Sequence, residues 1–263
     1  MADKEMPLTA HLEELRGVLL RSILAWAVAF VGCFLCRDAL FGLLFAPSRS
    51  DFVFYRLLCK LADSTGWLSL CPEAFESHFI STELTAQFMT HMEVALWAAL
   101  VIVSPYIIIL LYRFVSPALY QKERRFSVRL TVSAMALFLT GVVLNYFVIF
   151  PLSYRFLATY QVQNDVINTI TLSSYISTFL ILSLVLGVMF ELPVITGFLG
   201  RMGLIDAGML RKYRKHALVI ILIIAAVITP TGDAVTLLIV TAPVYLLYEA
   251  SILVVRFTCK ENA

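Results

Sequence analysis

The chain has 263 residues, of which 60% are hydrophobic and 14% are charged, and its mean hydropathy is +0.89. This composition lies outside the range of water-soluble domains, so the sequence predicts an all-α integral membrane protein. The net charge of +2 is too small to indicate a nucleic-acid partner.

Residues 8–21 predict an amphipathic helix that continues directly into the first membrane span. Its apolar face consists of leucines spaced three and four residues apart, which are Leu8, Leu12, Leu15 and Leu19. Glu14 lies on a neighbouring face, about where the chain enters the lipid. Two interpretations stay open: Glu13 and Glu14 pair with Arg16 and Arg21 on a solvated helix, or the Glu14 carboxylate binds a cation from outside. No cleavable signal peptide is expected, so this span should be retained.

Apolar runs predict six membrane spans along the chain. The first four are long enough to cross about 30 Å of hydrocarbon, and they are residues 17–36, 93–115, 128–150 and 172–200. Pro105 should be tolerated inside the second run, and Pro151 is expected to end the third. Glu191 and Pro193 are expected to kink the fourth.

The last two runs, residues 217–229 and 234–255, are predicted to form a short helical hairpin. The first offers only about 20 Å of helix before the breaker sequence Thr229–Asp233, which is too short for an unperturbed bilayer. This pair should therefore thin the membrane locally or lie against other helices.

Lysine and arginine are concentrated in the N-terminal tail, in the second and fourth loops and at the C-terminal end, which has Arg256 and, in the tail 257–263, Lys260. The positive-inside rule then places both termini in the cytoplasm. Residues 37–92, the only long loop, should form an extracytoplasmic cap of short helices. Residues 1–256 are expected to form a single membrane domain, since no tandem or inverted repeat is visible.

Conventional catalytic and metal-binding patterns are missing, so an enzyme, a metal site and a cofactor are not expected. The four histidines make no ligand set, and no Gly-rich phosphate loop appears. Cys33 and Cys36 have CxxC spacing but lie at the end of a membrane helix, which favours small buried residues. For Cys59 and Cys71 in the first loop, a disulfide and two unpaired thiols both stay open.

The second loop places one acid among several bases. Glu123 is flanked by Lys122, Arg124 and Arg125, and spacing alone favours simple neutralisation of its neighbours.

Several motifs occur in a fixed order along the chain. They are HLEELR at residues 11–16, F-x-S-P-A-L-Y-x-x-E-R-R at 114–125, F-E-L-P at 190–193, T-P-T-G-D at 229–233 and P-V-Y-L-L-Y-E at 243–249. Together they resemble the TatC family, the core subunit of the twin-arginine protein translocase, from Leu8 to Arg256. The resemblance implies a cupped bundle of six helices in the cytoplasmic (inner) membrane, in contact with membrane lipid and with further copies of itself. It also implies binding of twin-arginine signal peptides of folded proteins, TatA- and TatB-type single-span partners, and transport driven by the proton-motive force.

The resemblance assigns Glu14 and Glu123 as the acids that bind the signal peptide. Around them it places His11, Arg16, Phe114, Pro117, Tyr120 and Arg124. Two carboxylates suit this role, because each can accept paired hydrogen bonds from a guanidinium group.

Four further positions follow from the same resemblance. Glu191 corresponds to a buried acid of the fourth span, Pro47 to a first-loop proline, and Asp233 to an acid between the last two spans. Thr236 stands where a polar Ser-Gln pair is usual, and we expect it to replace the contact to a partner helix.

Two other functions are compatible with the sequence apart from the resemblance. A small secondary transporter would also place an acid such as Glu191 at mid-membrane, but it should show paired broken helices in two related halves. A scaffold subunit of a membrane complex would co-purify with partners yet fail to bind an isolated twin-arginine peptide.

Overall fold

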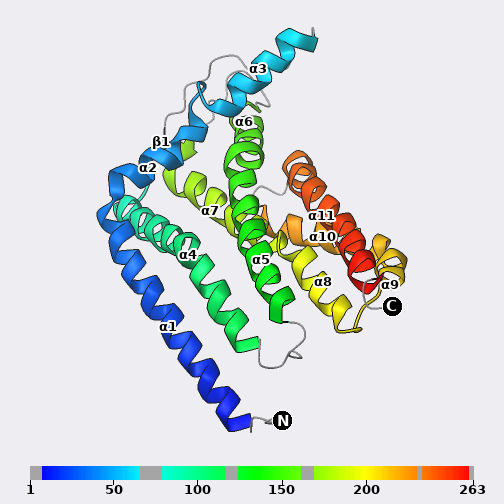
Figure 1. The fold of residues 1–263 in the computed structure, drawn as a ribbon. Coiled ribbons are helices and arrows are strands. Elements are labelled where there is room, and N and C mark those ends of the chain that lie inside the picture. The colour runs from blue at the N-terminus through cyan, green and yellow to red at the C-terminus, as the bar shows by residue number, and fades with distance from the viewer. Residues whose placement is uncertain (1–7, 66–78, 116–123, 161–168, 230–232, 261–263) are drawn as a thin grey trace, which may run out of the picture. The chain divides into compact units, whose positions relative to one another are not determined.

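The computed structural model describes residues 8–65, 79–115, 124–160, 169–229 and 233–260 (Figure 1). The described chain is mostly helical and divides into two compact units, residues 1–40 with 91–136 and residues 41–90 with 137–263. Within these ranges five helical stretches are long and apolar enough to cross a membrane. They are Leu12–Leu35, Ala86–Tyr112, Thr131–Thr159, Leu172–Arg201 and Ala234–Phe257.

In the first unit, helix α1 (Leu8–Leu35) packs against helix α4 (Ala86–Val115). Their contact is built from buried Cys33, Ala95 and Ala99, whose small side chains let the two helices approach closely. The charged N-terminal stretch and the first span form one uninterrupted helix, as the leucine spacing predicts, and α4 continues through Pro105.

Two contacts fix the relative direction of α1 and α4. The Trp26 indole nitrogen donates to the Leu96 carbonyl at 3.0 Å. His91 stacks on Phe34 with ring centroids 4.2 Å apart, and its Nε2 lies 3.1 Å from the Phe34 carbonyl oxygen. Because the later residue of α1 meets the earlier residue of α4, the two helices are antiparallel.

The second unit contains the remaining short helices, a pair of short strands and the C-terminal helices. From the first loop come α2 (Arg37–Phe45), the 3-10 helix Ala46–Ser48, α3 (Val53–Thr65) and β1 (Phe79–Ile80). Helix α5 (Arg124–Leu144), which begins in the first unit, leads through a π-helical turn (Asn145–Ile149) into α6 (Phe150–Thr159). Then follow β2 (Ile170–Thr171), α7 (Leu172–Met189), α8 (Leu192–Arg201), α9 (Ala207–Lys212), α10 (Arg214–Ile228) and α11 (Ala234–Lys260).

The prediction that Pro151 ends the third helical run is wrong, because the helix continues to Thr159. A proline inside a helix leaves an upstream carbonyl unpaired and crowds the preceding turn. Here the preceding turn is π-helical, and the Phe150 N–H donates to the Asn145 carbonyl five residues back. The wider turn accommodates the ring, and the helix resumes with the proline in its first turn.

The expectation of an all-α protein also needs a small correction. β1 and β2 form a two-residue parallel pair in which Phe79 lies opposite Ile170 and Ile80 opposite Thr171. These strands come from the first loop and from the approach to α7, so only the folded chain brings them together.

Helices α5 and α7 approach each other closely at glycines. A Cβ placed on Gly141 would lie 2.7 Å from the Leu186 carbonyl oxygen. Nearby, the fully buried Asn145 donates from Nδ2 to Ser183 Oγ at 2.7 Å and to the Phe179 carbonyl at 3.4 Å. The close crossing thus encloses a buried polar contact between the two helices.

Tyrosine hydroxyls fasten the first-loop helices to the spans of the second unit. Tyr175 donates to the Leu44 carbonyl at 2.8 Å, and Tyr146 donates to the Leu43 carbonyl at 2.9 Å. Tyr55, only 1% exposed, donates to the Pro151 carbonyl at 2.9 Å. The predicted short helices of the loop are confirmed.

Candidate functional site

The N-terminal acids lie exposed on the first turns of α1. Glu13, Glu14 and Arg16 are all solvent-exposed. Within the described residues, no ion pair joins Glu13 or Glu14 to Arg16 or Arg21, although helical spacing would permit one. The Glu14 carboxylate is therefore exposed and pairs with neither of these two bases. His11 belongs to the same helix, but its side chain lies outside the described part.

The second candidate acid, Glu123, lies outside the described residues, as do Pro117 and Tyr120. Arg124 begins α5, again without a described side chain, and Phe114 is half-buried near the end of α4. That Glu14 and Glu123 belong to one signal-peptide site therefore stays a prediction.

The antiparallel packing of α1 and α4 still limits where these segments lie. At a rise of about 1.5 Å per residue, Glu14 is about 18 Å along α1 from Trp26, and Phe114 is about 27 Å along α4 from Leu96. Both distances run toward the same end of the first unit, since Trp26 and Leu96 are in contact. Helix α4 thus leads into the second loop at the end of the unit that also presents Glu14.

A break between α7 and α8 places Glu191 in the predicted kink. Its backbone carbonyl accepts hydrogen bonds from the N–H groups of Val194 at 3.0 Å and Ile195 at 2.9 Å, so it starts the new helix. Pro193 lies in the first turn of α8, where a missing N–H is tolerated. The predicted kink is confirmed. One carboxyl oxygen of Glu191, Oε1, is buried without a hydrogen-bond partner in the described chain.

Asp233 has a structural role in the turn before α11. Asp233 Oδ1 accepts a hydrogen bond from the Thr236 backbone N–H at 2.7 Å, which is the arrangement of a helix N-cap. Thr236 itself is 1% exposed, and its Oγ1 has no hydrogen-bond partner among the described residues. Glu191 and Thr236 are therefore two of the five described side chains that keep a buried oxygen unpaired in the second unit; the others are Asn145, Ser153 and Thr241.

Two first-loop positions have contrasting outcomes. Pro47 is fully buried in the 3-10 helix, and its carbonyl lies 3.3 Å from the Tyr55 hydroxyl. Cys59 is disulfide-bonded, while Cys71 lies outside the described residues, so their pairing stays a prediction.

Cys33 and Cys36 are free thiols, but only Cys33 is buried, so the expectation of two buried residues is wrong for Cys36.

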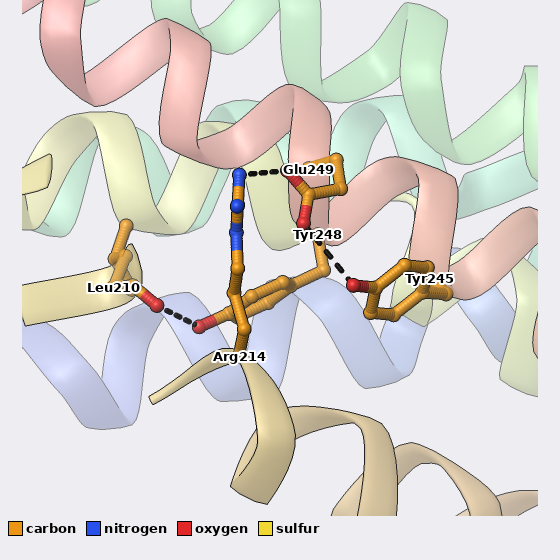
Figure 2. Close-up of polar contacts among 5 residues, drawn as sticks. All are labelled: Leu210, Arg214, Tyr245, Tyr248 and Glu249. Carbon is orange, nitrogen blue, oxygen red and sulfur yellow. Dashed lines mark hydrogen bonds and ion pairs between the residues drawn. The ribbon is translucent and has the colours of Figure 1, made fainter. Parts of the chain in front are cut away.

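A polar cluster that joins α11 to α9 and α10 was not predicted (Figure 2). Arg214 Nη2 lies 2.6 Å from Glu249 Oε2, and the Tyr245 hydroxyl donates to Glu249 Oε1 at 3.2 Å. Figure 2 shows Tyr248 turned to the other side, where its hydroxyl donates to the Leu210 carbonyl at 2.7 Å. A usable signal was the single acid Glu249 in an apolar run that returns toward the basic fourth loop.

Comparison with known proteins covers nearly the whole chain. The family model described as Sec-independent protein translocase protein (TatC) matches residues 10–243. The chain belongs to the TatC family. A TatC protein of Blattabacterium sp. subsp. Periplaneta americana is 33% identical over 262 residues, with 98% of each chain covered. A TatC protein of Listeria innocua is 33% identical, covering 99% of this chain and 95% of that protein.

A solved structure supports the same assignment. The crystal structure of the twin arginine translocase receptor TatC superposes with a TM-score of 0.75 at 28% identity, covering 94% of this chain and 99% of that one. This TatC-family chain is thus a multi-pass membrane protein and a component of a Sec-independent protein translocase, which makes it a transport protein. The matched region includes the motifs at 11–16, 114–125, 190–193 and 229–233.

Proposed function

We propose that this chain is the receptor and core subunit of a twin-arginine translocase. It binds the paired arginines of signal peptides on folded precursor proteins and exports them with TatA- and TatB-type single-span subunits, driven by the proton-motive force. The observation that supports this best is the nearly full-length likeness to a structure described as the twin arginine translocase receptor.

The proposed topology has six spans in the cytoplasmic membrane, with α10 as the short fifth span and both termini in the cytoplasm. Helix α10 has 15 residues, about 22 Å, so it would cross only a locally thinned bilayer. The exposed bases Arg211, Lys212, Arg214 and Lys215 at the α9–α10 junction support a cytoplasmic position for this loop.

The proposed receptor site combines Glu14 with Glu123 at the cytoplasmic membrane surface. An exposed Glu14 with no ion pair to a described base supports this, because its carboxylate can accept both hydrogen bonds of a guanidinium group. The remaining members of the site are His11, Arg16, Phe114, Pro117, Tyr120 and Arg124. The surrounding bases would repel a diffuse polybasic segment and favour two arginines at a fixed spacing.

The test measures binding of a twin-arginine peptide and of its Lys-Lys version to the protein in native membranes. Glu14→Gln and Glu123→Gln should each weaken binding by about 2 to 5 kcal/mol, the loss expected for one partner of a desolvated charge pair. Glu13→Gln is the matched control, since Glu13 is also exposed and lies one position away, and it should cost less than about 1 kcal/mol.

Retained discrimination would contradict the assignment. If either variant still prefers Arg-Arg to Lys-Lys as strongly as the unaltered protein, that acid is not part of the site. If Glu13→Gln weakens binding equally, the effect is one of net charge and no receptor pair exists.

Within the same function, Glu191 and Thr236 are proposed to contact a partner's transmembrane helix. An unpaired carboxyl oxygen inside a membrane protein is costly unless a partner completes it. The buried, unpaired oxygens of both residues support this contact.

A further inference from the structure

The loop between α8 and α10 exposes large apolar side chains. Met202 and Leu204, which directly follow the span Leu172–Arg201, are 57% and 63% exposed. Met209 on α9 and Tyr213 at its end are 37% and 49% exposed. Several large apolar side chains gathered in one short loop are unfavourable in water. Because the loop continues directly from a membrane span, these side chains suit the boundary between lipid head groups and acyl chains.

The same loop carries bases that no described acid neutralises. Arg211, Lys212 and Lys215 are exposed, and none of them forms an ion pair within the described chain. Asp206 is the one acid of residues 201–216, and its Oδ1 accepts a backbone N–H of α9 at 2.6 Å as the cap of that helix. The loop thus presents positive charge beside its apolar side chains.

A further base of the loop is held by α11 and differs from these three. Arg214 Nη2 lies 2.6 Å from Glu249 Oε2, and Figure 2 shows the Arg214 side chain turned toward α11. The Tyr248 hydroxyl donates to the Leu210 carbonyl at 2.7 Å, which fastens α9 to the same helix. Glu249 is already paired, so the acid of α11 that reaches this loop does not neutralise the other bases.

The charge of the loop selects among the groups found at that depth. Five bases lie within residues 201–215, and such a cluster next to a membrane span is typical of segments that bind anionic lipids. Arginine and lysine both donate hydrogen bonds to phosphate oxygens. A zwitterionic head group adds a cation of its own beside the phosphate, so positive charge favours a lipid with net negative charge.

We propose that residues 202–215 bind the head groups of anionic phospholipids in the adjacent leaflet. Arg211, Lys212 and Lys215 contact the phosphates, and the exposed apolar side chains lie among the first methylenes of the acyl chains. In the proposed topology this is the inner leaflet, but the binding itself involves neither Glu14 nor Glu123. The contact would fix the depth of the loop, and with it the start of α10, whose 15 residues are short for a bilayer.

The experiment uses the protein reconstituted in phosphatidylcholine bilayers. These contain a trace of photoactivatable phosphatidylglycerol or of photoactivatable phosphatidylcholine with the same chains, and labelled peptides are mapped by mass spectrometry. At low salt the label in residues 202–216 should favour phosphatidylglycerol at least fivefold, because each base near an anionic surface contributes about fivefold. At 1 M salt, where the Debye length is about 3 Å, this ratio should approach one.

A triple variant tests the three bases. Arg211→Gln, Lys212→Gln and Lys215→Gln together should lower the ratio of the two labels in residues 202–216 to below about twofold. The matched control makes the same change in net charge at exposed bases of the first loop and should leave that ratio unchanged; it combines Arg37→Gln, Arg49→Gln and Lys60→Gln.

Binding of the twin-arginine peptide is measured on the same triple variant. It should equal that of the unaltered protein, because the proposed receptor acids are intact. The receptor proposal and the lipid proposal can therefore fail separately.

Four results would overturn the inference. The first is a ratio near one in the unaltered protein, and the second is a ratio that the triple variant leaves unchanged or that the control lowers equally. The third is the absence of label from either lipid in residues 202–216, which would place the loop in water. The fourth is loss of the label when single-span partner subunits are reconstituted together with the protein, which would assign the loop to a protein partner.

Discussion

The close crossing of α5 and α7 makes Gly141→Ala the sharpest test of the packing. The new Cβ would lie 2.7 Å from the Leu186 carbonyl oxygen and 3.0 Å from the Gly187 Cα, both backbone atoms that cannot rotate away. Since carbon and oxygen in contact are usually about 3.3 Å apart or more, the helices must separate by about 0.6 Å.

That separation has two costs. Overpacking of a close contact destabilises the folded protein by about 1 to 3 kcal/mol. One turn further along, the separation would also stretch the hydrogen bond from Asn145 Nδ2 to Ser183 Oγ, which is 2.7 Å long. Buried polar groups that are incompletely paired cost about 1 to 3 kcal/mol of stability. Together these give a loss of about 2 to 6 kcal/mol, or a fall of about 4 to 24 °C in the melting temperature of a chain this size.

The measurement is thermal unfolding in detergent, with size-exclusion chromatography as the readout. Gly32→Ala in α1 is the control, because a Cβ there meets nothing within 4 Å. If Gly141→Ala melts within about 2 °C of Gly32→Ala, the close approach of α5 and α7 is wrong.

Three further outcomes are expected. Glu191→Leu should abolish co-purification with single-span partners and leave the protein at least as stable, because it removes a buried unpaired oxygen, whereas normal co-purification would exclude the proposed contact. Burial raises the pKa of Tyr55, so the folded state favours the neutral phenol and its stability should be constant below pH of about 10 and fall at higher pH. Tyr55→Phe should lower the stability by about 1 to 3 kcal/mol at pH 8 and should reduce the loss of stability at alkaline pH in a thermal melt. If the alkaline loss is unchanged in this variant, other groups cause it. A double-mutant cycle on Arg214→Ala and Glu249→Ala should give a coupling of at most about 1 kcal/mol, since their side chains are 44% and 31% exposed, and a coupling above about 2 kcal/mol would contradict this.

Sequence reasoning succeeded where a local rule decides the structure. Leucine spacing predicted one continuous α1, and the pair of Glu191 and Pro193 predicted the break that separates α7 from α8. It failed at Pro151, because the usual rule assumes a regular α-helix upstream, and a π-helical turn satisfies the same backbone groups differently.

The candidate site was predictable only in part, because many of its contacts join distant residues. Arg214 and Glu249 are 35 residues apart, so no helical period connects them. The unpaired state of Ser153 depends on how α6 faces α7, which no residue type specifies by itself. Asp233 is a different case, because an acid three residues before a backbone N–H at a helix start is a recognisable N-cap that local spacing alone could predict.

The π-helical turn at Asn145–Ile149 also sets the direction in which later side chains point. Each residue of an α-helix advances by about 100°, so Asn145 and Ser153 would be separated by about 80° around a regular helix. One extra residue in the wide turn removes about 100° of that advance and brings the two side chains to within about 20° of one line. Asn145, whose amide bonds to Ser183 of α7, and Ser153, whose hydroxyl is buried, thereby share one side of the helix. Deleting one residue between them would restore a regular α-helix, and the seven remaining steps of about 100° each would keep Ser153 on the same side as Asn145.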